Sequence, residues 1–98
     1  MGQGSRKRPV PKLLAKKLKL LRTVRGWTQQ ETAERVGEIV RLRSKAAPPD
    51  GAMVSRFERG EREPNLIVLY AYAKVVGMSV DIFIDDRFTL DNFTRAIT

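Results

Sequence analysis

The stretch from residue 52 to residue 60 carries the side chains of this chain that are best suited to contact another molecule. Its spacing predicts a helix in which Val54 and Phe57, three positions apart, share one apolar face. Arg56 and Arg59 fall on another face, where Met53 joins them, and form an outward cationic strip. A guanidinium can donate two parallel hydrogen bonds to a phosphate or to the edge of a base, so this strip is a candidate binding surface.

The ends of this helix are marked in the sequence. Asp50 follows two prolines and can accept hydrogen bonds from the free amides of the first turn, and Gly60 can adopt the left-handed conformation that ends a helix. A helix of about nine residues is unstable alone, so other helices must hold it.

The first of those supporting helices is predicted from residue 12 to residue 25. Leu14, Leu18 and Leu21 repeat at the spacing of one buried stripe, and Gly26 follows as the stop. Its lysines are expected outside that stripe: Lys12, Lys16, Lys17 and Lys19.

A second helix is predicted to begin after Thr28, because Thr28 and Glu31 have the spacing of a capping box. Small and apolar residues such as Ala33 and Val36 face inward from it. Gln29 lies in its first turn, where the helix dipole favours an anion, so we expect Gln29 to contact a phosphate.

Further helices are predicted after Asn65, a good N-cap, and after Ser79, which would cap residues 80 to 84. The buried face predicted after Asn65 consists of Leu66, Leu69, Tyr70, Ala73 and Val76. Thr89 can cap a last helix bearing Leu90, Phe93 and Ile97. Its apolar stripe must pack either on the chain's own core or on a second subunit, and the second subunit is slightly favoured.

Composition narrows the possible functions. The 98 residues suit one domain, and no apolar run approaches the roughly 18 residues of a membrane span, so we expect a cytoplasmic protein. Cysteine and histidine are absent, which removes thiolate metal sites and the commonest metal ligand and general base. We therefore expect no metal, no cofactor and no enzymatic activity.

The net charge of +8 is unevenly distributed. Residues 1 to 45 hold thirteen Lys or Arg against three Glu, a net +10, whereas residues 46 to 98 hold six against eight acids, a net −2. A cationic half of this kind favours a polyanionic partner, either nucleic acid or an anionic membrane. A basic amphipathic first helix on a membrane surface is the weaker alternative, since the bundle would then lose the wall formed by Leu14, Leu18 and Leu21.

Two blocks of sequence together resemble the Cro and phage-repressor family of helix-turn-helix domains, the Xre type. They are residues 26 to 37, beginning Gly-Trp-Thr-Gln-Gln-Glu, and residues 54 to 60, Val-Ser-Arg-Phe-Glu-Arg-Gly, followed by Pro64-Asn65-Leu66. The resemblance covers about residues 12 to 85 and implies an all-α, five-helix bundle whose third helix enters the major groove of DNA. Residues 1 to 11 would be a mobile basic arm, and residues 86 to 98 a C-terminal extension and possible dimer contact.

The chain departs from that family between Gly37 and Asp50, where the connection between the second and third helices is unusually long. Either the second helix continues through Gly37 until the segment Ala46-Ala47-Pro48-Pro49 stops it, or Gly37 keeps a turn and residues 38 to 45 form a separate helix. The first is favoured, since an interior glycine costs only about 1 kcal/mol relative to alanine. In both cases three cations would form a basic projection near the DNA-binding face: Arg41, Arg43 and Lys45.

The resemblance assigns roles to individual side chains. It implies base contacts from the early third helix, with Arg56 the main candidate and Ser55, Met53 and Ala52 beside it. Phosphate contacts are expected from helix N-termini and from charge, not from the resemblance, at Thr28, Gln29, Asn65, Arg59, Arg62, Arg41, Arg43 and Lys45. The family pattern also pairs Glu58 with Arg22 of the first helix, a structural ion pair.

The expected function is sequence-preferring binding of double-stranded DNA by a symmetric homodimer that regulates transcription, as a repressor. A narrower version is an antitoxin that represses its own operon, with a toxin as protein partner. The alternative is a protein-interaction module that kept the fold and lost specific readout, because Gly51 and Ala52 cannot make bidentate hydrogen bonds and Met53 offers only apolar contact.

Overall fold

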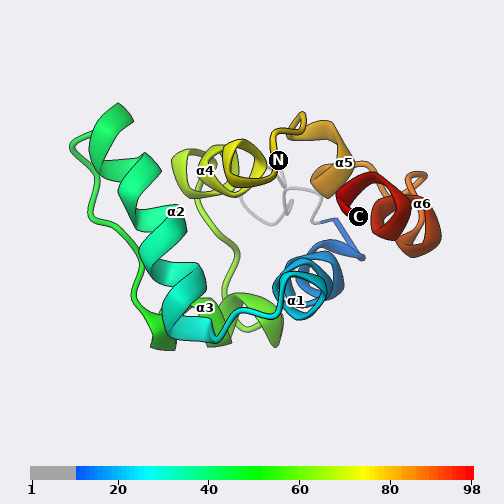
Figure 1. Cartoon of the computed structure of the whole chain (residues 1–98), viewed down its shortest axis with the longest axis horizontal. Coiled ribbons are helices and arrows are strands. Elements are labelled where there is room, and N and C mark those ends of the chain that lie inside the picture. The colour runs from blue at the N-terminus through cyan, green and yellow to red at the C-terminus, as the bar shows by residue number, and fades with distance from the viewer. Residues whose placement is uncertain (1–10) are drawn as a thin grey trace, which may run out of the picture.

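The computed structural model describes residues 11–98, and these residues are all-helical. The predicted arm of residues 1 to 11 lies, except for Pro11, outside the described residues. The six helices are α1 (Leu14–Arg25), α2 (Gln29–Arg43), α3 (Gly51–Glu58), α4 (Leu66–Val76), α5 (Asp81–Ile84) and α6 (Leu90–Ile97). In Figure 1, α1 and α3 lie along the lower side, α4 and α5 along the upper side, and α2 and α6 at opposite ends. No helix within residues 11–98 is long and apolar enough to cross a membrane.

Most helix ends are set by the local signals that the sequence predicts. The hydroxyl of Thr28 accepts a hydrogen bond from the Glu31 amide while the Glu31 carboxylate accepts one from the Thr28 amide, which completes the capping box. Asp50, Asn65 and Thr89 cap α3, α4 and α6 by a single hydrogen bond, in which the side-chain oxygen accepts from the backbone amide three positions ahead. The chain turns with positive φ after three helices, at Gly26, Gly60 and Gly77.

The start of α1 is set differently, by a residue from the other end of the chain. The helix begins at Leu14, and its leading amides, those of Lys12 and Leu13, donate to the carboxylate of Asp86 at 2.9 and 3.1 Å. These two hydrogen bonds hold the pKa of Asp86 below its ordinary value. The loop between α5 and α6 thus supplies the cap that α1 lacks in its own sequence.

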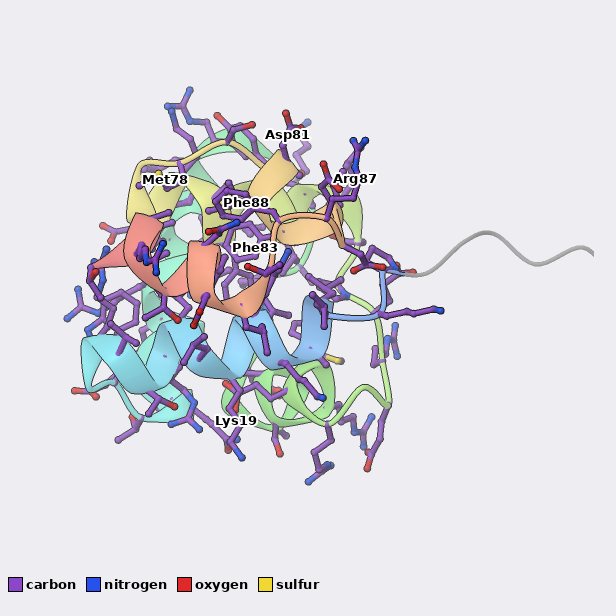
Figure 2. All side chains as sticks on the ribbon, turned by 90° about the vertical axis from the view of Figure 1, so that its right-hand side faces the viewer. Lys19, Met78, Asp81, Phe83, Arg87 and Phe88 are labelled. Carbon is purple, nitrogen blue, oxygen red and sulfur yellow. The ribbon has the colours of Figure 1, made fainter. Side chains whose placement is uncertain are left out.

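The helix α6 packs on the core of its own chain. Phe93 and Ile97 are buried, and the rings of Phe83 and Phe93 meet edge to face with centroids 5.2 Å apart. Figure 2 shows α6 lying along α1. The favoured partner for the apolar stripe of α6 was a second subunit, and that prediction is wrong, because the stripe packs on the chain's own core. This stripe therefore gives no reason to place a dimer contact in residues 86 to 98.

The buried face of α4 differs from the one predicted. Leu66 is 79% exposed and Tyr70 and Val76 are only half-buried, whereas Ala71 and Tyr72 are fully buried. Of the predicted set, only Leu69 and Ala73 are buried. The segment is apolar on every side, so its own periodicity does not fix which face turns inward, and packing against α2 decides it.

Lys17 was expected outside the buried stripe of α1, and that expectation is wrong. Its side chain is fully buried, and its ammonium donates to the carbonyl oxygens of Ile82 at 2.7 Å and Asp85 at 3.0 Å. The rings of Phe88 and Phe93 lie 5.7 and 5.9 Å from Nζ. Desolvation lowers the pKa of Lys17, although nearby aspartates oppose the shift. The lysine stem serves as core, and its ammonium ties α1 to α5.

The helix α2 runs unbroken through Gly37 to Arg43, as the favoured alternative predicts. Gly37 is buried, and a Cβ atom built on it would lie 3.2 Å from Cβ of Pro48. The absence of a side chain at Gly37 lets the returning loop of residues 44 to 50 lie directly against the helix. The long connection is therefore two extra turns of α2 followed by a loop that packs back along it.

Candidate nucleic-acid interface

The predicted contact helix, α3, is anchored by its apolar face. Val54 is fully buried and Phe57 is 4% exposed, while Ala52 and Arg56 are exposed and Ser55 is half-buried between the two faces. An eight-residue helix thus turns a short polar and cationic face to solvent.

Met53 is the exception among the predicted base-contacting residues. Its side chain is half-buried and packs against the core cluster, beside the hollow that Pro48 and Pro49 help to line. The outward strip therefore consists of Arg56 and Arg59 without Met53. The reason is the returning loop, because it brings apolar proline rings to the side of α3 on which Met53 lies.

A buried polar network holds α3 against α1. Arg22 donates from Nε and Nη2 to the two carboxylate oxygens of Glu58, at 2.7 and 3.0 Å, and from Nη1 to the carbonyl oxygen of Trp27 at 3.0 Å. This is the ion pair that the family resemblance implies. The hydrogen bond to Glu58 raises the pKa of Arg22, and burial raises the pKa of the neighbouring Tyr72 phenol.

The two predicted phosphate contacts at the start of α2 are also bonded within the chain. The side-chain nitrogen Nε2 of Gln29 donates to the Glu58 carboxylate at 3.3 Å, so Gln29 belongs to the network that holds α3 in place. The Thr28 hydroxyl accepts from the Glu31 amide in the capping box. Both residues lie at the N-terminal end of α2, next to α3, but their side chains first serve the fold.

Gln30 is a residue that sequence reasoning missed at this site. A Cβ atom built on Gly51, the first residue of α3, would lie 2.9 Å from Oε1 and 3.5 Å from Cα of Gln30. The N-terminal end of α3 therefore lies directly against the first turn of α2, and Gln30, itself exposed, is beside it. The signal in the sequence was Gly51, because a residue without a side chain permits this close approach.

The cations beside α3 differ in whether an acidic side chain neutralises them. Arg59 pairs with Glu61 at 3.0 Å, both side chains being more than half exposed. Arg56 and Arg62 are exposed, and their guanidinium groups have no hydrogen bond or ion pair within residues 11–98. Lys19 of α1 projects on the same side of the molecule as α3 (Figure 2). The face thus keeps unneutralised positive charge on more than one element.

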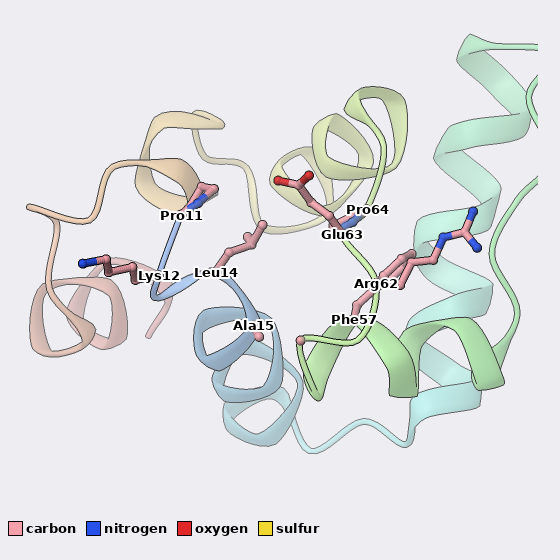
Figure 3. A pocket seen from close by; sticks show the side chains of 9 residues that line it. Pro11, Lys12, Leu14, Ala15, Phe57, Arg62, Glu63 and Pro64 are labelled. Carbon is pink, nitrogen blue, oxygen red and sulfur yellow. The ribbon is translucent and has the colours of Figure 1, made fainter. Parts of the chain in front are cut away.

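Arg62 also lies at the rim of a hollow between the start of α1 and the turn that follows α3 (Figure 3). Its walls are largely apolar, with Leu14, Phe57 and Pro64 among them, and its volume is about 370 Å³. On its other side Arg62 borders a second hollow with Asn65 and Met53. The cap residue Asn65 is bonded to the Val68 amide through its side-chain oxygen, so its exposed amide nitrogen is the group left for a phosphate.

The predicted basic projection lies elsewhere. Arg41, Arg43 and Lys45 are exposed at the C-terminal end of α2, whereas α3 lies beside the N-terminal end (Figure 1). Fifteen residues at about 1.5 Å each separate these ends by roughly 20 Å. The structure therefore does not bring these three cations together with Arg56. The reason is that the insertion lengthens a continuous helix away from α3 instead of folding back over it.

A second cationic group, also missed in the sequence, lies where α1 joins α2. The guanidinium of Arg35 is 4.5 Å from the centre of the Trp27 ring, and that of Arg25 is 5.7 Å from it. Both arginines are exposed. Stacking on one indole fixes two positive charges close to the start of α2.

Comparison with family models, with curated proteins and with solved structures found no match in any of the three. Residues 11–98 hold no group of three or more acidic side chains placed to bind a metal ion. What the site can do must therefore be inferred from its own side chains: a short, braced helix with a cationic outer face.

Proposed function

We propose that this chain binds double-stranded DNA with sequence preference and regulates transcription, as a repressor, by inserting α3 into the major groove. The observation that supports this proposal most is the way α3 is held in the fold. Its inner face is buried, Glu58 at its end is held by Arg22, and Arg56 on its outer face has no partner within residues 11–98.

The dimensions of α3 suit this role. An α-helix with its side chains is about 10–12 Å in diameter, which fits the major groove of about 12 Å in width, and the eight residues of α3 form such a helix. Arg56 can donate two hydrogen bonds to O6 and N7 of guanine, and the half-buried Ser55 can reach a base or a sugar beside it. Ala52 can only touch a thymine methyl group. Direct readout would thus be concentrated in one arginine.

Backbone contacts would come from the cations around α3. Arg59, Arg62 and Lys19 flank it, and each phosphate that they neutralise releases counterions and makes binding depend on salt. The first turn of α2, with Gln29 in it, offers its helix dipole to one more phosphate.

The resemblance to Xre-type helix-turn-helix domains supports the same proposal. The insertion lengthens α2 at its C-terminal end and leaves the other end, where Gln30 lies against Gly51, in close contact with α3. A symmetric homodimer would place two copies of α3 in successive major grooves, about 34–36 Å apart.

The decisive experiment is selection of bound sequences from a pool of random duplexes with the purified protein. We expect enrichment of a two-fold symmetric motif with a guanine in each half-site. Titration of the selected duplex and of a random duplex at several salt concentrations should then give specific binding with a steep salt slope. Failure to enrich any motif would refute sequence-preferring binding.

One observation favours the alternative of a protein-interaction or antitoxin-like module with lost readout. Met53 packs inward, and the first residues of α3, Gly51 and Ala52, have no hydrogen-bonding side chain. Such a module would enrich no motif in the selection, and in the titration it would bind all duplexes equally weakly or not at all.

A further inference from the structure

The outer face of α4 forms an apolar groove that the proposed DNA-binding face does not use. The groove has a volume of about 690 Å³ and runs between the C-terminal end of α2 and the start of α5. It is lined by Arg43, Leu66, Ile67, Tyr70 and Val80.

This face exposes more apolar surface than folding requires. Leu66 is 79% exposed, the highest value among the large apolar side chains of residues 11–98, and Leu42 is 74% exposed one position before Arg43. A leucine side chain left in water forgoes the free energy that burial of its apolar surface would give. Leu66 is continuous with the partly exposed Ile67, Tyr70 and Val80, and a contiguous apolar patch of this kind is typical of an interaction surface.

The charged side chains that lie against the groove residues are cationic, while the exposed Asp81 follows Val80 at one end. Arg43 lines it, and Nζ of Lys74 lies 5.9 Å from the centre of the Tyr70 ring, one turn further along α4. None of the lining residues is acidic. A ligand for this face would therefore combine an apolar stripe with negative charge.

We propose that this groove binds an acidic amphipathic helix of another protein. The groove face runs over about two turns of α4, from Leu66 and Ile67 through Tyr70 to Lys74. This length matches the two-turn apolar stripe of a docked helix, at its positions i, i+3, i+4 and i+7. Arg43 and Lys74 flank those positions and can pair with carboxylates on either side of the stripe.

The shape and charge of the groove argue against other occupants. A two-fold contact between copies would bring Arg43 and Lys74 close to their own counterparts, and each chain already carries a net charge of +8. An anionic bilayer is flat and cannot enter the space between the half-buried Ile67, Tyr70 and Val80, so Leu66 is the apolar lining residue that it could take up.

The position of the groove leaves α3 free. In Figure 1, α4 lies on the upper side of the molecule and α3 on the lower side. A helix bound to α4 and a duplex bound to α3 would not compete. The proposal does not depend on DNA binding, and either one can fail alone.

The test uses the full chain and a labelled synthetic helix with Leu at i, i+3, i+4 and i+7 and Glu at the flanking positions, followed by fluorescence anisotropy. One control peptide carries Lys in place of Glu, and another has the same composition with the Leu positions scrambled. We expect saturable binding of the Glu peptide alone. Binding of the scrambled peptide with equal affinity would overturn the proposal, since generic attraction to a cationic protein would then explain it, and so would no binding.

Variants locate the binding site. Leu66→Ser should weaken binding at least tenfold, and Lys74→Glu should weaken the Glu peptide while strengthening the Lys peptide. Val24→Ser is the matched control, because Val24 is another exposed apolar residue, on α1, and should bind as wild type does. Equal effects of Leu66→Ser and Val24→Ser would refute the groove as the site. Circular dichroism of each variant shows whether the fold is kept. We expect Leu66→Ser to keep it, because the Leu66 side chain is exposed.

Two further measurements separate the other occupants. Co-sedimentation with vesicles of phosphatidylserine and phosphatidylcholine should show no dependence on Leu66, and sedimentation velocity should give the same oligomeric state for wild type and Leu66→Ser. Vesicle binding lost in Leu66→Ser would assign the face to a membrane. A dimer lost in that variant would assign it to a second copy of this chain. Either result would overturn the proposal.

Discussion

Arg22 and Glu58 lie 36 positions apart in the chain and form a two-point ion pair, with hydrogen bonds of 2.7 and 3.0 Å. Only 3% of the Glu58 side chain and 19% of the Arg22 side chain are exposed. Two further hydrogen bonds hold the pair: Arg22 donates to the carbonyl oxygen of Trp27, and the Gln29 side chain donates to Glu58. Through it, α1 and the start of α2 fix the end of α3, and with it the direction in which Arg56 points.

Glu58→Gln should destabilise the protein by about 3 kcal/mol, because Arg22 would keep its charge without its partner in a largely buried site. Urea unfolding at neutral pH measures the change. The matched control is Glu61→Gln, which breaks the exposed pair with Arg59 and should cost less than about 1 kcal/mol. Equal costs for the two variants would show that the buried pair has no special role.

Arg56→Ala should weaken binding to the selected duplex by about 1–3 kcal/mol and relax the preference at one base position in each half-site. Arg95→Ala makes the same change on an exposed position of α6 and should leave affinity and specificity unchanged. Selection from a random pool with each variant gives both quantities. An unchanged motif for Arg56→Ala would show that Arg56 does not contact a base.

Lys17→Met keeps the buried stem and removes the ammonium, which leaves the carbonyl oxygens of Ile82 and Asp85 without that donor. The expected loss is about 1–3 kcal/mol of unfolding free energy. Lys16→Met is the neighbouring control, and since Lys16 is exposed it should change stability by less than about 0.5 kcal/mol. A Lys17→Met protein as stable as wild type would mean that desolvation of the ammonium cancels its hydrogen bonds.

Acid should release the cap that Asp86 provides. Since the folded pKa of Asp86 lies below its ordinary value of 3.8, its contribution to stability is present above that pH and is lost as the pH falls through the folded pKa. Asp86→Ala should therefore be less stable than wild type at pH 7 and lose less of its stability on going to pH 2. Urea midpoints at the two pH values test this, with the exposed Asp91→Ala as control. Parallel pH profiles for wild type and Asp86→Ala would contradict the role of the carboxylate.

Gly37→Leu should destabilise by about 1–3 kcal/mol, because the loop at Pro48 occupies the space that a side chain needs. Gly37→Ala should cost far less, since better helix propensity, worth about 1 kcal/mol, offsets a contact of 3.2 Å that a small loop movement relieves. Thermal unfolding of both variants checks the order. If Gly37→Leu were as stable as Gly37→Ala, the loop would not be held against α2.

The ends of the helices were predictable because their signals are local. Thr28, Asp50 and Asn65 each bond an amide three positions ahead, and Gly26 and Gly60 turn the chain with positive φ, so neighbouring residues alone determine these features. The inner face of α3 was predictable for the same reason, since Val54 and Phe57 are its large side chains at helical spacing. The pairing of Arg22 with Glu58 required more than local pattern, and it followed from the family resemblance.

Other features were decided only by the tertiary structure, because the local sequence fits two or more arrangements equally well. The segment of α4 is apolar all round, so packing on α2 selected Tyr72 for the core and left Leu66 in solvent. The sequence around Lys17 does not indicate that this lysine is buried. Its ammonium nevertheless donates hydrogen bonds to carbonyl oxygens 65 and 68 residues away, inside the fold. Asp86 caps a helix more than 70 residues earlier. In each case the deciding partner is distant in the chain, and its free energy is gained only once the helices have packed.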